Sequence, residues 1–236
     1  MQSFEKDKDT LEILLGQLVN LFRDGKPVRM SKRTGQMITF QELIDEVGVD
    51  ATRYLMLSRN SDQQIDFDIE VAKKQDNSNP VYYVQYAHAR ICSILRKCYL
   101  DLGANGTSTS AFGSGGFGAQ GADEAKVACM PIEDIAAQLV CEPDLSKLTD
   151  ESELALCGLM EKFPDLLAEA AFQRAPHKLV HYSRELASSF HHFYTNCRVM
   201  DADKKTRKAR IALCDASRII LALSLNLLGV EAPRSM

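Results

Sequence analysis

The segment N-P-V-Y-Y-V-Q-Y-A-H-A-R, residues 79–90, is the most informative part of the sequence. Proline is favoured at the first position of a helix, because the N–H that it lacks would have no partner there. Beyond Pro80, apolar residues recur at intervals of three and four, and this spacing predicts a long amphipathic helix. Tyr83, Tyr86 and Arg90 are separated by three and four residues, so they fall on one face of it.

The sequence from residue 149 onward predicts four further helices, so the chain is expected to be mainly α, with a helical bundle. Each predicted helix begins with an acidic, hydroxyl or proline residue that favours a helix N-terminus, and a glycine ends the last one. The predicted starts are Thr149, Pro164, Pro176 and Asp203, and the predicted end is Gly229. The third helix is expected to bury Leu179, Val180, Leu186, Phe190 and Phe193.

Residues 1–75 predict a small α/β unit in front of this bundle. Asp24-Gly25 lies between two extended runs and is typical of a tight β-hairpin. Residues 39–42 form the Thr-x-x-Glu pattern of a capping box and predict a short helix. We expect Asp50 and Asp68 to cap two more helices, the second of them ending near residue 75.

Residues 103–122 have a different composition, because most of the chain's 13 glycines occur there together with several serines and threonines. Such a composition buries too little apolar surface to offset the entropy of ordering, so we expect a flexible insertion between helices. A glycine-rich phosphate-binding loop is the alternative. It would need a preceding strand and a fixed glycine spacing, and the sequence shows neither.

Composition excludes several classes of protein. The chain has 236 residues, 45% hydrophobic and 25% charged, with a formal net charge of −4. These values exclude collagen, wholesale disorder and a histone-like protein held to nucleic acid by bulk charge. The charged N-terminus and the short apolar run at 219–230 fit neither a signal peptide nor a membrane span, so we expect a cytoplasmic protein without membrane contact. The seven cysteines lack Cys-x-x-Cys spacing, so we expect free thiols and no metal site.

Two groups of cations are candidates for phosphate binding. Residues 29–35 follow a predicted strand and combine three cations with two hydroxyls and a glycine, which suits a polyphosphate. The last helix opens with Lys204, Lys205, Arg207, Lys208 and Arg210. These cations lie at the unfavourable end of the helix dipole, which favours contacts with a nucleic-acid backbone. For both groups, a solvated basic surface is the alternative, and it applies more strongly to a weaker basic stretch at 174–184.

The loop Arg29-Met30-Ser31-Lys32-Arg33 resembles the K-M-S-K-S loop of class I aminoacyl-tRNA synthetases. Within this class the chain is most similar to arginyl-tRNA synthetase, which shares the M-S-K-R-T-G form of the loop, the D-F-D of residues 66–68 and the whole segment 79–90. The resemblance extends from about Leu11 to Met236, apart from the glycine-rich stretch. The H-x-G-H signature of the class is missing, and Arg29 and Arg33 replace the usual first Lys and final Ser.

The resemblance implies roles for the loop. Lys32 would contact the ATP phosphates and stabilise charge while arginine attacks the α-phosphate, and Ser31 would act beside it. The remaining residues of this ATP loop would be Arg29, Met30, Arg33 and Gly35. The complete enzyme would use ATP, with magnesium as counterion, whereas this chain would bind no cofactor tightly. Without the H-x-G-H half-site, we expect the chain to be inactive alone and to be a C-terminal portion.

The resemblance also implies two domains. Residues 1–75 would end a Rossmann-type catalytic domain, and residues 76–236 would form an α-helical anticodon-binding domain. Unstacked anticodon bases are recognised by stacking and by base-edge hydrogen bonds, which suits a platform of aromatic and arginine side chains. The implied anticodon-binding residues are Tyr83, Tyr86, Arg90, Tyr194 and Met236. The implied contacts to the tRNA backbone are Lys204, Lys205, Arg207 and Lys208.

The expected partner is therefore tRNA-Arg, bound by a monomer. Three alternatives remain open at this stage. The tyrosines of segment 79–90 would be core residues if their hydroxyls found partners inside the bundle. The chain could be a synthetase-derived RNA-binding module without catalysis, or a helical protein-interaction domain that binds no RNA.

Overall fold

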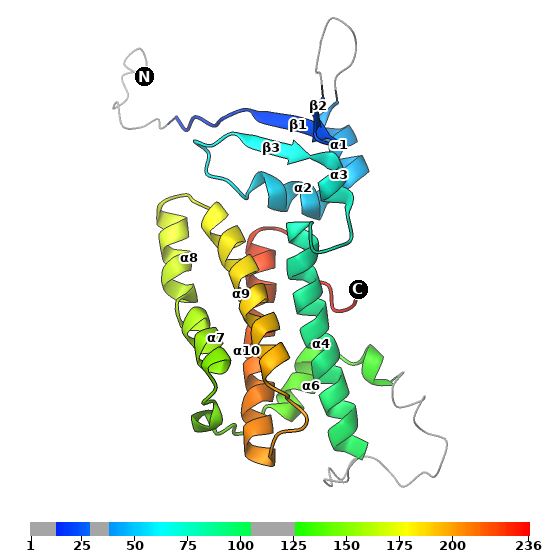
Figure 1. The fold of residues 1–236 in the computed structure, drawn as a ribbon, viewed down its shortest axis with the longest axis vertical. Helices are drawn as coiled ribbons and strands as arrows, with labels where there is room; N and C mark the ends of the chain where they lie inside the picture. The colour runs from blue at the N-terminus through cyan, green and yellow to red at the C-terminus, as the bar shows by residue number, and fades with distance from the viewer. Residues whose placement is uncertain (1–12, 29–37, 105–125) are drawn as a thin grey trace, which may run out of the picture.

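The computed structural model describes residues 13–28, 38–104 and 126–236. It consists of a small three-stranded sheet with short helices, stacked on one end of a helical bundle (Figure 1). The elements of the first unit are β1 (Val19–Arg23), β2 (Lys26–Pro27), α1 (Phe40–Val47), α2 (Val49–Met56), β3 (Ile65–Asp68) and α3 (Ile69–Lys73). Those of the bundle are α4 (Pro80–Ala104), α6 (Ile132–Leu139), the 3-10 turn η3 (Leu145–Lys147), α7 (Glu151–Glu161), α8 (Phe163–Phe172), α9 (His177–Asn196) and α10 (Lys204–Leu227).

The sheet has the strand order β2-β1-β3. Strands β1 and β2 form the predicted hairpin, with Phe22 opposite Pro27, and Asp24 and Gly25 take positive φ angles in its turn. Strand β3 pairs parallel to β1, and helices α1 and α2 form the crossover between these two strands. The prediction of a small α/β unit ahead of a mainly helical chain is therefore confirmed.

Side-chain capping hydrogen bonds begin several of the helices, among them α1 and α3. Thr39 and Glu42 form the expected capping box of α1, and Asp68 caps α3 through the N–H groups of Glu70 and Val71. The expectation for Asp50 was wrong, because Gly48 caps α2 and Asp50 lies inside its first turn. The Asp50 carboxylate instead accepts hydrogen bonds from Gln85 and from the backbone of Glu231.

Several other boundaries differ from the sequence prediction by a few residues, since α7 begins at Glu151 and not at Thr149, and α8 begins at Phe163 and not at Pro164. Helix α3 ends at Lys73, two residues early, and α4 continues through Gly103 and Ala104, the first residues of the predicted glycine-rich insertion. The rest of that insertion, 105–122, lies outside the described residues. Helix α6 was not predicted. At the other end of the bundle, Gly229 ends α10 as expected, with a φ of 67°.

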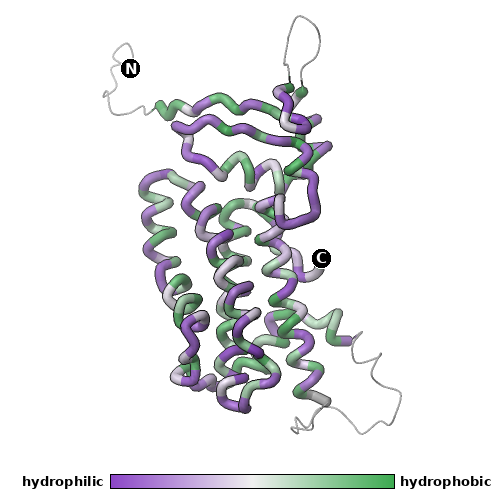
Figure 2. The backbone as a smooth tube through the Cα atoms, viewed as in Figure 1, coloured by the Kyte–Doolittle hydropathy of each residue, from purple (hydrophilic) through white to green (hydrophobic). Residues whose placement is uncertain are grey.

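The bundle has one hydrophobic core. Helix α4 packs against α6, α9 and α10, and α9 also contacts α7, α8 and α10. All five core residues predicted for α9 are buried. Hydrophobic and hydrophilic positions alternate along the bundle helices, as expected for amphipathic helices (Figure 2). Within the described residues, no helix combines the length and the apolar character needed to cross a membrane.

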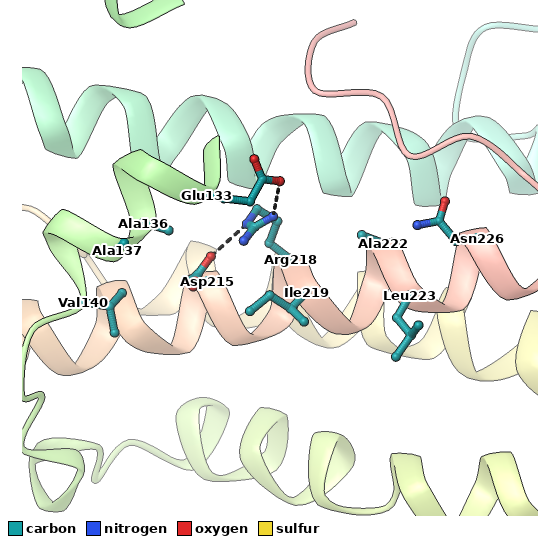
Figure 3. A pocket seen from close by; sticks show the side chains of 10 residues that line it. All are labelled: Glu133, Ala136, Ala137, Val140, Asp215, Arg218, Ile219, Ala222, Leu223 and Asn226. Carbon is teal, nitrogen blue, oxygen red and sulfur yellow. Dashed lines mark hydrogen bonds and ion pairs between the residues drawn. The ribbon is translucent and has the colours of Figure 1, made fainter. Parts of the chain in front are cut away.

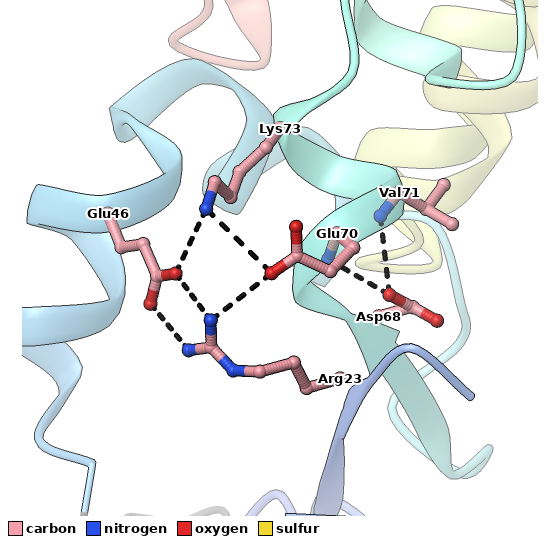
Figure 4. Close-up of polar contacts among 6 residues, drawn as sticks. All are labelled: Arg23, Glu46, Asp68, Glu70, Val71 and Lys73. Atoms are coloured by element: carbon pink, nitrogen blue, oxygen red, sulfur yellow. Dashed lines mark hydrogen bonds and ion pairs between the residues drawn. The ribbon is translucent and has the colours of Figure 1, made fainter. Parts of the chain in front are cut away.

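Ion pairs connect the helices of the first unit to its sheet (Figure 4). Arg23, at the end of β1, donates two hydrogen bonds of 2.8 Å to Glu46 of α1, and Lys73 of α3 donates a third of 3.1 Å. Arg23 also contacts Glu70 at 3.1 Å. These hydrogen bonds, above all those from Arg23, lower the pKa of Glu46 to about 2.

Candidate nucleic-acid interface

Aromatic and cationic side chains meet where α4 lies beside α9. The guanidinium of Arg90 donates a hydrogen bond of 3.0 Å to the hydroxyl of Tyr86, and its Cζ lies 5.3 Å from the centre of the Tyr194 ring. His191 lies 5.4 Å from Tyr83 and 6.3 Å from Tyr86, between ring centres. We call these five residues the aromatic face. Four of them were predicted from the sequence as anticodon-binding residues, and the structure brings those four together.

The aromatic face is neither core nor free surface. Arg90 is exposed, and the four rings are half-buried. Tyr83 and Tyr194 pack against the bundle core, and Tyr194 also stacks on the buried ring of Phe190. The open alternative that the tyrosines are core residues therefore applies only in part. All four rings keep some exposure to solvent, and Tyr86 is held by contacts with its neighbours on α4 and with His191.

His191 was not singled out from the sequence. It precedes Tyr194 by three residues, so the helical spacing places both on one face of α9. That spacing was the available signal, but it does not show that the same face of α9 meets the tyrosines of α4. Burial, and to a lesser extent the charge of Arg90, lowers the pKa of His191. Both effects favour the neutral form of the imidazole.

Met236, the fifth predicted anticodon-binding residue, ends a tail that is fixed along α4. Gln85 donates to the carbonyl of Glu231, His88 donates to that of Pro233, and Arg96 donates to that of Arg234. Residues 88 and 90 are about 200° apart around a helix, so the His88 contact lies on a different side of α4 from Arg90. Met236 itself is 56% exposed. The structure thus places the tail beside α4 without joining it to the aromatic face.

The predicted backbone-contact residues lie at the end of the bundle remote from the sheet, where α10 begins (Figure 1). Lys204 and Lys205 are exposed, and Arg207 and Lys208 are half-buried. The neighbouring Arg210 differs from them. It forms an ion pair with the fully buried Glu153, with 2.5 Å between Nε and Oε1, so its charge is used inside the bundle.

The weaker basic stretch at 174–184 is partly neutralised within the fold. Lys178 pairs with Glu169 at 2.6 Å. The rings of His177 and His181 lie 6.2 Å apart, and burial, followed by the charge of His181, lowers the pKa of His177. This stretch therefore offers less positive charge than its sequence indicates.

The predicted ATP loop lies outside the described residues, which resume at residue 38. It includes Arg29, Met30, Ser31, Lys32, Arg33 and Gly35. The structure does describe the segment leading into it, since the backbone N–H of Val28 bonds to the carbonyl of Leu21 on β1 at 2.8 Å. The described part of this segment therefore ends at residue 28, directly after the hairpin, and the predicted ATP loop stays a prediction.

A hollow of about 620 Å³ lies between α6 and α10 (Figure 3). Its walls are mostly apolar, and the only cation among its lining residues, Arg218, is paired with Asp215 at 2.8 Å and Glu133 at 3.6 Å. Over the described ranges, no three His, Cys, Asp or Glu side chains are grouped so that they could hold a metal ion. The aromatic face is therefore the better candidate for a functional site.

Comparison with known proteins gives a consistent result. Residues 132–236 match the model of the DALR anticodon binding domain. The arginine–tRNA ligase of Carboxydothermus hydrogenoformans is 43% identical over 98% of this chain and 36% of its own length. That of Heliobacterium modesticaldum is 44% identical, with the same coverage.

Solved structures give the same family. A Campylobacter jejuni structure assigned as an arginyl-tRNA synthetase superposes with a TM-score of 0.75 at 29% identity, over 100% of this chain and 43% of its own. Thermus thermophilus arginyl-tRNA synthetase gives a TM-score of 0.61 at 25% identity, over 92% of this chain and 34% of its own. The chain spans just over a third of the length of the curated relatives it matches. It is a homologue of the arginyl-tRNA synthetases, equivalent to the C-terminal portion that carries their DALR anticodon-binding domain.

Proposed function

We propose that this chain is the anticodon-binding part of an arginine–tRNA ligase, which charges tRNA-Arg with arginine at the expense of ATP. The match to the DALR anticodon binding domain supports this proposal. The observation that carries it is the aromatic face, where three tyrosines, a histidine and an arginine from two helices are gathered at half-buried or exposed positions. Single-stranded RNA bases are bound by stacking on such side chains.

In this proposal Arg90 has a central role, and its contacts support it. Its guanidinium is held between the Tyr86 hydroxyl and the Tyr194 ring, while the residue as a whole is exposed. A guanidinium fixed in this way presents a flat cationic surface on which a base can stack. Its N–H groups can also donate hydrogen bonds to the edge of a base. Tyr83, Tyr86 and Tyr194 supply rings beside it.

Lys204, Lys205, Arg207 and Lys208 contribute differently. They lie at the remote end of the bundle and would neutralise backbone phosphates, which adds affinity without base recognition. Arg210 is left out of this set because Glu153 holds its charge.

The ATP-dependent step would be the task of the loop that follows β2. Lys32 and Ser31 would contact the ATP phosphates, with Arg29, Met30, Arg33 and Gly35 shaping the loop. ATP with magnesium would supply the activated phosphate in the complete ligase. Because the sequence holds no H-x-G-H half-site, we expect no charging of tRNA by this chain alone. Formation of arginyl-tRNA by the purified chain above background would contradict this expectation.

Binding to a tRNA-Arg transcript across a salt series, beside the same transcript with its anticodon bases replaced, tests the main proposal. We expect one chain per tRNA, weaker binding at higher salt, and a further loss on anticodon replacement. The variant R90A should lose the preference for the native anticodon. The control R96A removes the same charge from another side of α4, where Arg96 bonds to the tail, and should keep that preference.

Equal binding to both transcripts would refute anticodon recognition and leave a generic basic surface. No binding at low salt would favour the alternative of a protein-interaction domain. The alternative of a stand-alone RNA-binding module predicts the same binding, and the gene sequence upstream separates the two. An in-frame H-x-G-H region there would support the ligase.

A further inference from the structure

The geometry points to His191 as a positioning residue of the aromatic face, whose ring holds Tyr83 and Tyr86 of α4 in place from the neighbouring helix α9. This inference rests on the proposed function and adds a residue that neither the sequence motifs nor the family match assigns. In this inference His191 itself contacts no base. His191 would act through the two tyrosines that it touches.

The contacts that support this role cross between helices. The His191 ring lies 5.4 Å from the Tyr83 ring at an interplanar angle of 57°, and 6.3 Å from the Tyr86 ring at 28°. It also meets the buried ring of Phe190 edge-on at 6.1 Å, which links it to the bundle core. Among the described side chains, it is the ring of α9 that contacts both tyrosines. Without it, Tyr86 would keep its contacts with Tyr82 and Arg90, both on its own helix.

An ordered tyrosine binds a base more strongly than a free one, because less rotational freedom is lost on binding. A half-buried aromatic partner provides such order at little cost, since ring pairs attract each other beyond the area that they bury. Burial of His191 also favours its neutral form, and this suits the position. The cation next to it is Arg90, and a second positive charge there would repel the guanidinium.

The neighbouring histidine provides a natural contrast. His192 is exposed, and its ring lies within 3.0 Å of the side-chain amide of Asn196, one turn further along α9. It differs from His191 in sequence position by one residue and in helix direction by about 100°. A variant at His192 therefore removes the same chemical group from the same helix turn while leaving the tyrosines supported.

The test compares H191A, H191F and H192A in the complete 236-residue chain. The readouts are the affinity ratio between the native and anticodon-replaced tRNA-Arg transcripts, the dependence of each affinity on salt, and the thermal unfolding of each variant. We expect H191A to lower the ratio about five-fold, which is ~1 kcal/mol at about 1.4 kcal/mol per ten-fold. The salt dependence should stay unchanged. H191F should recover most of the ratio because it restores the ring, and H192A should match the wild type.

A residue with a purely structural role would lower both affinities together and would not alter their ratio. If H191A keeps the wild-type ratio, the inference is overturned while the proposed function stands. If the wild-type chain shows no preference between the transcripts, both fail together. Should H191A unfold, H191Q replaces it as a neutral polar residue without a ring, and a wild-type ratio in folded H191Q would also overturn the inference.

Discussion

Replacement of Glu153 by alanine should be among the most damaging single substitutions in the bundle. Glu153 is fully buried, and each of its carboxylate oxygens has partners. One accepts hydrogen bonds of 2.9 Å from the backbone N–H groups of Thr149 and Asp150, and the other accepts from Arg210 at 2.5 Å. The variant E153A would leave the cation and two backbone donors without this acceptor.

The expected magnitude follows from these contacts. Removing one partner of a buried ion pair costs roughly 3–5 kcal/mol, because the remaining charge stays buried without compensation. Arg210 keeps a second bond, to the carbonyl of Arg198 at 2.9 Å, and its side chain is 17% exposed, so we expect the lower half of that range. A domain of this size loses about 2–4 °C of melting temperature per kcal/mol. The predicted decrease is therefore roughly 6–16 °C.

Urea and thermal unfolding followed by circular dichroism would measure the loss. Glu151 provides the matched control, since it begins the same helix but is exposed, and E151A should change the unfolding free energy by less than about 0.5 kcal/mol. In a double-mutant cycle, E153A and R210A should show strong coupling. A loss below about 1 kcal/mol for E153A, or no coupling to Arg210, would refute the assignment of Arg210 to the interior.

Three further predictions concern other parts of the chain. The pKa of Glu46 is held at about 2, below its value of about 4.3 in the unfolded chain, so its contribution to stability is complete above about pH 4.5 and is lost as the pH falls towards 2. Urea unfolding at several pH values should thus show a steeper acid loss for the wild type than for E46Q. Replacing Lys204 and Lys205 by alanine should weaken the binding of both tRNA transcripts equally. The slope of log affinity against log salt should fall by about one for each phosphate that is no longer neutralised, and an unchanged slope would show that the two lysines lie outside the interface. G229A should lower the unfolding free energy by about 1–2 kcal/mol, because Gly229 has a positive φ at the end of α10, and a neutral result by urea unfolding would contradict this.

The predictable parts of this fold are those governed by local chemistry. A capping box, an N-cap aspartate and a terminal glycine each act over about four residues, so Thr39, Asp68 and Gly229 indicated helix ends correctly. The prediction that Asp50 caps a helix was wrong because the contacts of Asp50 are not local. Its carboxylate bonds to Gln85 and to Glu231, which is 181 residues away, and no local pattern contains that information.

The candidate site, too, was predictable only as far as local sequence patterns reach. Helical spacing placed Tyr83, Tyr86 and Arg90 on one face, but the meeting of that face with Tyr194 and His191 depends on how α4 packs against α9. The number of free cations at the start of α10 was overestimated from the sequence for a related reason. Arg210 belongs to that run in sequence, yet its partner Glu153 lies 57 residues earlier, on α7.

Buried hydrogen bonds connect the sheet unit to the bundle. The hydroxyl of Tyr54 on α2 bonds to Ser183 of α9 at 2.9 Å, and burial raises the pKa of Tyr54 to about 12. The buried Asn79, directly before α4, donates to the carbonyls of Ala72 and Lys74.

Buried polar contacts of this kind have one favourable arrangement and are costly to leave unpaired. A displacement of the start of α4 would therefore have to break the two hydrogen bonds that Asn79 donates to Ala72 and Lys74, at the end of α3.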